Sequence, residues 1–239
     1  MRGLAQVQQV MRELPLTAVY VPLKATTRAG GDLLGRVAGR FQALPEALLA
    51  EVAAAPERAG PTPVETALQN HPAVVVLGDP GAGKSTLLKV LALALAEQPN
   101  SPLPILLPLN AYARHLREQG DLSLSRFLGR YYAAFQDRLA QIEPLFMAAL
   151  RAGQAVVLLD GLDEAQSDRR HLARLVEAFA AEYIPRPAAA PDAPPVAGNR
   201  LIVTSRIVGY DEAPLSSRRW RTYTLTDFGR PEIEQFARQ

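Results

Sequence analysis

The sequence has no cysteine in its 239 residues. The absence of thiols excludes disulfide bonds, thiolate metal sites and cysteine nucleophiles, and it fits a reducing compartment. Histidine is scarce as well, with only His71, His115 and His171. These three are scattered and lack the short spacing of metal-binding histidines. We therefore interpret all three as structural or surface residues.

The sequence also lacks an excess of charge and a long apolar run. There are 26 basic and 24 acidic residues, a net charge of +2, which offers no general electrostatic basis for binding nucleic acid or an anionic membrane. Apolar runs such as 90–96 are too short to span a bilayer, and the N-terminus lacks the apolar core of a signal peptide. We expect a soluble, cytoplasmic protein with neither a membrane nor nucleic acid as its partner.

The most informative stretch that is present reads VVVLGDPGAGKST, at residues 74–86. A short apolar strand leads into a glycine-rich turn and then into the apolar pattern of a helix, which is the context of a P-loop. Backbone N–H groups of such a loop and the N-terminus of the following helix bind phosphate. We expect Lys84 to reach the β- and γ-phosphates, the Ser85 hydroxyl to bind Mg²⁺ and Thr86 to reach the α-phosphate. The candidate nucleotide-binding residues are Gly78, Asp79, Pro80, Gly81, Ala82, Gly83, Lys84, Ser85 and Thr86.

Strand and helix patterns alternate from residue 73 onward. This alternation, in a chain that is 48% hydrophobic, is typical of a mostly parallel sheet covered on both faces. We predict strands at 73–77, 104–109, 155–160, 201–205 and 222–225, and helices at 84–97, 124–135, 141–151, 168–184 and from Pro231. The expected fold class is α/β, a three-layer P-loop domain with a mostly parallel five-stranded sheet.

The residues ahead of this pattern are interpreted as a small, α-rich lead-in. We divide the chain into this lead-in at 1–63, a possible linker or lid, and a nucleotide-binding domain at 64–239. Within and just after the lead-in we predict a strand at 17–23, a helix at 45–55 with proline near its first turn, and a short helix from residue 61 to about 69 that Thr62 caps.

A second apolar strand, at residues 155–160, is followed by acids in the run AVVLLDGLDE. Asp160 occupies the place of a Walker B aspartate, where a carboxylate can hold Mg²⁺ directly or through water. Asp163 and Glu164 follow within one turn, and either could orient or deprotonate the attacking water.

A third apolar strand reads LIVTSR at residues 201–206 and ends in polar residues at the same edge of the sheet. Ligands of open α/β sheets bind at the carboxyl ends of strands. We expect Arg206 to sense the γ-phosphate as a fixed positive charge, with Thr204 or Ser205 hydrogen-bonding nearby. The candidate catalytic residues are thus Asp163, Glu164 and Arg206, and the candidate metal ligands are Ser85 and Asp160.

Together these motifs resemble the NACHT family of STAND-class signal-transduction NTPases, the bacterial branch of the class that includes NOD-like receptors. The resemblance rests on GDPGAGKST at 78–86, LLDGLDEA at 158–165 and IVTSR at 202–206. Gly161 stands where many P-loop ATPases have an acid directly after the Walker B aspartate. The resemblance covers residues 64–239 closely and 1–63 loosely.

This resemblance implies an ATP/ADP switch that hydrolyses ATP with Mg²⁺ in bacterial signalling or antiphage defence. In such proteins exchange of ADP for ATP changes domain packing and permits self-association through the nucleotide-binding domain. Arg206 matches the family's sensor 1 arginine. Family members continue into a helical domain and a winged-helix domain that supplies a histidine to the β-phosphate. Nothing up to Gln239 matches that histidine, so we expect a fragment whose effector and sensor domains lie outside this chain.

Two alternatives remain open at this point. The chain could be a nucleotide-binding module with little or no turnover, stabilised by its ligand through mass action. It could also be an AAA-like remodelling or loading ATPase that acts on nucleic acid, although the near-neutral charge and the DGLDE spacing argue against this. Phosphate release and salt-dependent DNA binding distinguish these two alternatives from the switch.

Overall fold

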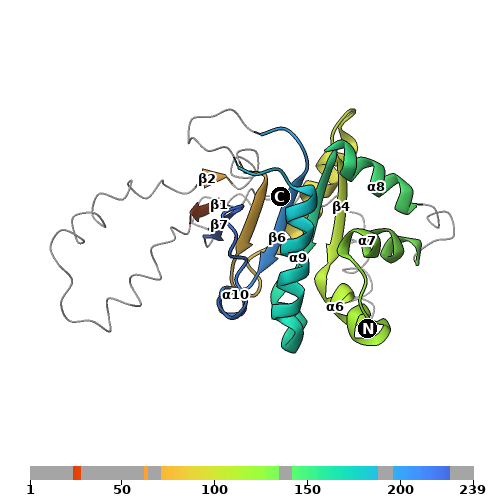
Figure 1. The fold of residues 1–239 in the computed structure, drawn as a ribbon. Coiled ribbons are helices and arrows are strands. Elements are labelled where there is room, and N and C mark those ends of the chain that lie inside the picture. Colours follow the sequence, from red (N-terminus) through yellow and green to blue (C-terminus); the bar gives the residue numbers. More distant parts are fainter. Residues whose placement is uncertain (1–23, 28–61, 64–70, 135–141, 188–195, 227–239) are drawn as a thin grey trace, which may run out of the picture.

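A computed structural model describes residues 24–27, 62–63, 71–134, 142–187 and 196–226 (Figure 1). Its sheet has seven strands in the order β2-β1-β7-β3-β6-β5-β4. The strands are β1 (Lys24–Thr27), β2 (Thr62–Pro63), β3 (Ala73–Leu77), β4 (Leu103–Pro108), β5 (Ala155–Asp160), β6 (Arg200–Ser205) and β7 (Trp220–Leu225). The five strands from β7 to β4 are parallel, and β1 and β2 add antiparallel at one edge.

Helices cover both faces of the sheet, as in a three-layer α/β fold. They are α5 (Lys84–Glu97), α6 (Leu109–Gln119), α7 (Leu124–Ala133), α8 (Ile142–Ala152), the 3₁₀ helix η3 (Leu162–Asp168), α9 (Arg169–Tyr183) and α10 (Ile207–Glu212). One core joins α5 to side chains such as Val76 and Leu158. The other, larger core lies on the opposite face of the sheet. There the helices α6, α7, α8 and α9 pack against side chains such as Val75 and Leu159. None of the helices in the described ranges is long and apolar enough to cross a membrane.

The α/β class and the mostly parallel sheet are confirmed, and the five predicted strands are its five parallel members. The strand count is corrected to seven, because β1 pairs with β7 through Ala25 and Leu225. The short helix predicted from residue 61 is wrong at its start, since Thr62 and Pro63 pair with β1. Pairing between distant segments outweighs the local capping signal here.

Helix bounds follow the sequence closely where the pattern is long. The prediction at 84–97 coincides with α5. The prediction for α7 has the correct start and ends two residues late, and those for α8 and α9 differ by one residue at each end. The predictions missed α6 and α10, which begin directly after β4 and β6. The strand predicted at 17–23, the helix at 45–55 and the helix from Pro231 lie outside the described residues.

Parallel strands place all their carboxyl ends at one edge of the sheet. In Figure 1 the arrowheads of β3, β4 and β6 point to the lower edge, where α10 also lies. The residues that follow β3, β5 and β6 therefore meet at this edge.

Candidate active site

The loop between β3 and α5 is shaped by glycines. Gly81 and Gly83 both have φ of 84°, in the left-handed region that other residues rarely adopt. A Cβ at Gly78 would lie 3.1 Å from the Ala82 Cβ, so a larger residue there would press on the opposite side of the loop. The loop thus needs glycine for its conformation at two positions and for close approach at a third.

The start of α5 offers backbone donors. Gly83 is the N-cap residue, and among the described residues no side chain caps this end of the helix. The side chains of Ser85 and Thr86, in the first turn, are exposed. An uncapped N-terminus carries unpaired N–H groups and the positive end of the helix dipole, which together attract an anion.

Lys84 lies across the loop. Its Nζ donates hydrogen bonds to the carbonyl oxygens of Gly78, at 2.7 Å, and Asp79, at 2.9 Å. Partial burial lowers the pKa of Lys84, and the nearby Arg206 lowers it further, whereas Asp163, Asp160 and Asp79 raise it. Burial is thus the main influence on this lysine, and the charged residues that act on it include the acids and the arginine that the motifs singled out.

Asp160 ends β5 and is held by the neighbouring strand β6. The Thr204 hydroxyl, which is fully buried, donates to Asp160 Oδ1 at 2.6 Å and accepts from the Gly161 N–H at 2.9 Å. This hydroxyl therefore fixes both the carboxylate and the backbone that follows it.

Asp163 and Arg206 form a tight pair across η3 and the end of β6. Asp163 Oδ1 accepts from the backbone N–H of Arg206 at 2.9 Å and from the Ser205 hydroxyl at 3.4 Å. Asp163 Oδ2 lies 3.2 Å from Arg206 Nε, and the side chains are 10% and 54% exposed respectively. A Cβ at Gly209 would lie only 2.4 Å from the Asp163 Cβ. Both oxygens of this carboxylate are thus engaged, and the pair is packed against the glycine of α10.

Glu164 has a different environment. Its side chain is exposed, and its Oε2 accepts a hydrogen bond from Asn110 Nδ2 at 2.9 Å. Sequence reasoning did not single out Asn110 as a functional residue. The available signal was its position just after β4, at the same edge of the sheet as the other polar strand ends.

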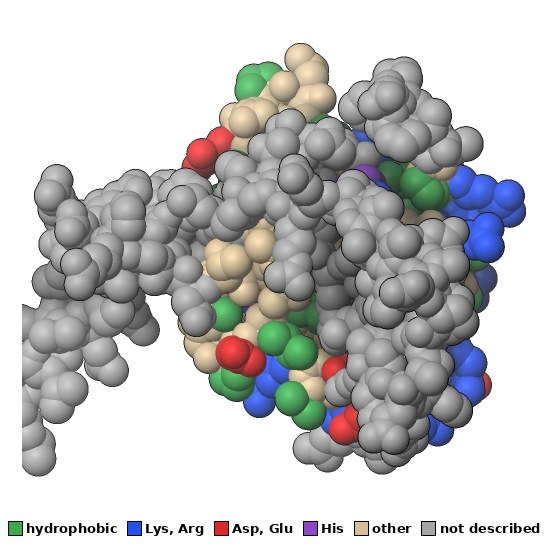
Figure 2. All heavy atoms as spheres, turned by 90° about the vertical axis from the view of Figure 1, so that its left-hand side faces the viewer, with side chains coloured by type: hydrophobic (Ala, Val, Ile, Leu, Met, Phe, Trp, Pro, Cys, Tyr) green, Lys and Arg blue, Asp and Glu red, His purple; other side chains and the backbone are tan. Residues whose placement is uncertain are grey.

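The arrangement brings Lys84, Asp160, Asp163 and Arg206 close together, although they follow three different strands. The order β3-β6-β5 makes these strands neighbours and so juxtaposes their carboxyl ends. At the lower end of Figure 2, level with α10 in Figure 1, acidic, basic and hydrophobic side chains are mixed on the surface. Among the coloured side chains at this end, no single sign of charge dominates.

The donor set suits a magnesium ion. The candidate ligands Ser85 and Asp160 carry a hydroxyl and a carboxylate, and such hard oxygen ligands are those that Mg²⁺ prefers. Within the described ranges no group of three or more His, Cys, Asp or Glu residues could hold a metal ion. This donor set fits an ion held by few protein ligands together with phosphate oxygens, as is usual for magnesium in nucleotide sites.

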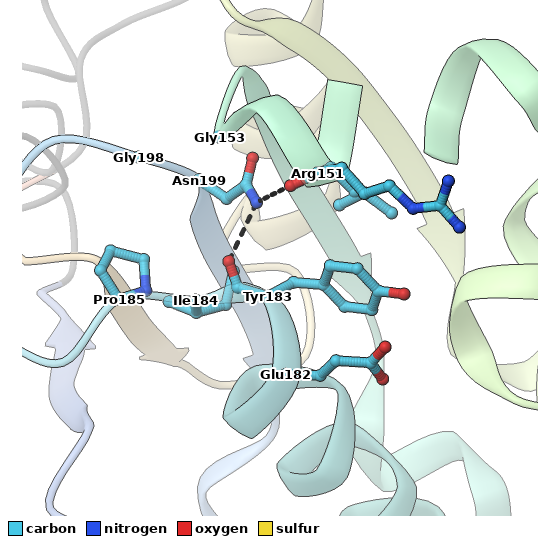
Figure 3. A pocket seen from close by; sticks show the side chains of 9 residues that line it. Arg151, Gly153, Glu182, Tyr183, Ile184, Pro185, Gly198 and Asn199 are labelled. Carbon is cyan, nitrogen blue, oxygen red and sulfur yellow. Dashed lines mark hydrogen bonds between the residues drawn. The ribbon is translucent and has the colours of Figure 1, made fainter. Parts of the chain in front are cut away.

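A pocket of about 540 Å³ lies at the opposite edge of the sheet, where β5 and β6 begin (Figure 3). Asn199 lines it and is only 2% exposed. Its Oδ1 accepts from Ala155 N at 2.9 Å, and its Nδ2 donates to the carbonyls of Leu150 at 2.7 Å and Tyr183 at 2.9 Å. These bonds join β5 to the last turn of α8 and to the end of α9. The pocket is therefore a structural junction away from the P-loop.

Comparison with known proteins gives a match to one family model and a similar solved structure. The family model described as the NACHT domain matches residues 72–239. A solved structure similar to this chain is a signal transduction ATPase with numerous domains (STAND) protein with a tetratricopeptide repeat sensor from Pyrococcus horikoshii. The identity is 16% and the TM-score 0.36, over 73% of this chain and 24% of that one. This chain thus spans about a quarter of the length of that structure. No curated protein matches the chain.

Proposed function

Because this chain belongs to the NACHT domain family of P-loop NTPases, we propose that it binds ATP and ADP with Mg²⁺ and hydrolyses ATP as a signal-transduction switch. One observation carries the proposal. Lys84 of the P-loop shares its electrostatic environment with Asp160, Asp163 and Arg206, which come from two other strand ends. A lysine, a metal-binding carboxylate and a fixed arginine around one loop are what transfer of a γ-phosphoryl group to water requires.

Phosphate binding is assigned to the loop and to the start of α5. The N–H groups of the loop and of the first helical turn surround the phosphates, and Lys84 turns from the loop carbonyls toward the β- and γ-phosphates. Ser85 and Asp160 hold Mg²⁺, which when bound neutralises charge on the phosphate oxygens. Thr204 keeps the Asp160 carboxylate in place through its hydroxyl.

Water activation is assigned to Glu164. Both oxygens of Asp163 are engaged by Arg206 and Ser205, so Asp163 holds the arginine in place. Glu164 is exposed at the same edge and can accept a proton from the attacking water. Arg206, half exposed and anchored by Asp163, presents a charge to the γ-phosphate that cannot be lost by deprotonation.

As a switch, the protein would convert nucleotide state into a change of domain packing. The γ-phosphate can shift such an equilibrium only if it contacts one state more than the other. We place effector and sensor domains outside this chain, and self-association through the nucleotide-binding domain, in bacterial signalling or antiphage defence in the cytoplasm. This part of the proposal rests on the family.

The test is direct nucleotide binding to wild type and to Lys84→Ala. We expect Mg-ADP and Mg-ATP to bind wild type, and the variant to lose at least about 100-fold in affinity, since a charge-assisted contact to phosphate is removed from a partly buried site. Lys89→Ala, an exposed lysine on the same helix, is the matched control. Equal nucleotide affinity of Lys84→Ala and wild type would contradict the assignment of the P-loop as the nucleotide-binding site.

Two further measurements test which nucleotide the protein binds and whether it hydrolyses ATP. Denaturing the purified chain and chromatographing the released nucleotide shows whether it carries adenine, and released guanine nucleotide would overturn the assigned specificity. Multiple-turnover phosphate release, with Asp160→Asn and Glu164→Gln as controls, separates hydrolysis from binding alone. Tight binding without release would leave a nucleotide-binding module and contradict the proposed hydrolysis.

A further inference from the structure

We propose that Asn110 is a positioning residue that holds the Glu164 carboxylate at the carboxyl edge of the sheet for water activation. The inference deepens the proposed function and rests on it. It assigns a role to a side chain that is 54 positions away from Glu164 in the sequence and belongs to none of the three motifs.

The fold places Asn110 beside the end of β5. Strands β4 and β5 are parallel neighbours, and Pro108 is the register partner of Asp160. α6 begins at the next residue, Leu109, so Asn110 is the second residue of that helix. The side-chain amide therefore lies level with the turn that follows Asp160, and its Nδ2 donates to Glu164 Oε2 at 2.9 Å.

Gly161 supports the same placement from the other side. Its φ is 79°, and a Cβ there would lie 2.9 Å from Glu164 Cδ and 3.1 Å from Glu164 Cγ. The Glu164 side chain thus passes directly over the residue that follows Asp160, through space that only glycine leaves open. The absence of a Cβ at Gly161 and the hydrogen bond from Asn110 together define where the Glu164 carboxylate lies.

The Asn110–Glu164 bond is a poor stabiliser of the fold. Both side chains are exposed, and exposed polar pairs contribute little because water competes for the same groups. Placement of a general base is different, because small displacements of a reacting group are costly in rate. The bond is therefore expected to matter for turnover far more than for folding.

The experiment is a double-mutant cycle on ATP hydrolysis with Asn110→Ala and Glu164→Gln. Loss of the base is expected to lower kcat by about 10²-fold or more, and loss of its positioning partner by about tenfold with KM little changed. In the Glu164→Gln background, Asn110→Ala is expected to have no further effect. Asn110→Asp keeps the size but replaces the donor with a second carboxylate, and should lower kcat at least as much.

The controls distinguish positioning from structure. Glu118→Ala, on an exposed position of the same helix, should keep the wild-type kcat. The thermal midpoint and the ADP affinity of Asn110→Ala should equal those of wild type. Equal and independent losses in both backgrounds would show that Asn110 does not act through Glu164, and would overturn the inference.

The two proposals fail separately. If wild type hydrolyses ATP, Glu164→Gln abolishes this and Asn110→Ala retains the full rate, then only the positioning role is wrong. If wild type binds nucleotide and releases no phosphate, then the proposed hydrolysis is wrong and the positioning role falls with it.

Discussion

At the scale of single residues, Gly209 determines how the Asp163–Arg206 pair can pack. It lies in α10, where alanine would gain about 1 kcal/mol of helix propensity over glycine. This gain is opposed by a steric clash, because a Cβ at position 209 would lie 2.4 Å from the Asp163 Cβ. The Asp163 Cβ is too near the backbone to move aside easily. Overpacking of this kind costs about 1–3 kcal/mol, so the steric term outweighs the helical one.

We therefore predict that Gly209→Ala weakens the site and the fold together. The free energy of unfolding should fall by about 1 kcal/mol net of the helix gain, measured by urea titration. Phosphate release should fall as well, since displaced Asp163 no longer anchors Arg206. Val208→Ala, whose native side chain is 77% exposed on the same helix, is the control and should be near neutral. A Gly209→Ala variant as stable and active as wild type would show that the clash is relieved without moving Asp163.

At the scale of elements, Asn199 joins three of them. Its side chain forms hydrogen bonds with the backbone in the last turn of α8, at the last residue of α9 and at the first residue of β5. The carbonyls near helix ends have no partner within their own helix, so a buried helix end needs a donor from elsewhere. One amide supplies two such donors and also accepts from the first N–H of β5.

We predict that Asn199→Ala destabilises the protein by about 2–4 kcal/mol, because it removes three hydrogen bonds between a buried side chain and the backbone. The measurement is the denaturant midpoint at constant slope. Gln154→Ala, an exposed neighbour, serves as the control. Nucleotide affinity, measured where both proteins are folded, should be unchanged, since Asn199 lies at the opposite edge of the sheet. A loss of affinity without a loss of stability would contradict this structural role.

At the scale of the whole molecule, ligand binding and folding are linked. A nucleotide that binds only the native state at 100 times its Kd stabilises that state by about 2.7 kcal/mol. For a chain of this size each kcal/mol raises Tm by about 2–4 °C.

Mg-ADP at that concentration should therefore raise Tm by about 5–10 °C. Lys84→Ala should show no rise at the same ADP concentration, and Lys89→Ala should match wild type. A rise in Lys84→Ala equal to that of wild type would mean that ADP binds elsewhere on the molecule.

The sheet also extends beyond the parallel strands. β1, from the segment interpreted as a lead-in, pairs antiparallel with β7 through Ala25, Thr26 and Thr27. The division at residues 63 and 64 stays a prediction. What the pairing does establish is that this part of the lead-in shares the sheet of the nucleotide-binding core.

Much of the fold could be predicted because its signals are local. The strands β3, β4, β5 and β6 are largely apolar segments of five or six residues, and α5 has a long apolar pattern directly after a glycine-rich loop. The P-loop, Asp160 and Arg206 could be proposed as site residues because each lies at or just after the end of a strand that is visible in the sequence. The predictions missed α6, which starts at the residue after β4 with no loop between them, and α10, which has only six residues. The strands β1 and β2 were missed or misassigned because their pairing partners lie far away in the sequence.

By itself the sequence determined the family and the fold class, and it singled out the charged residues Asp160, Asp163 and Arg206 that lie near Lys84. Only the tertiary structure decided which partners the two acids after Asp160 have: Asp163 pairs with Arg206, 43 residues away, and Glu164 with Asn110, 54 residues away. The physical reason is that a motif records the order of residues along one segment. A hydrogen bond between segments depends on which strands become neighbours, and that order is set by packing of the whole sheet.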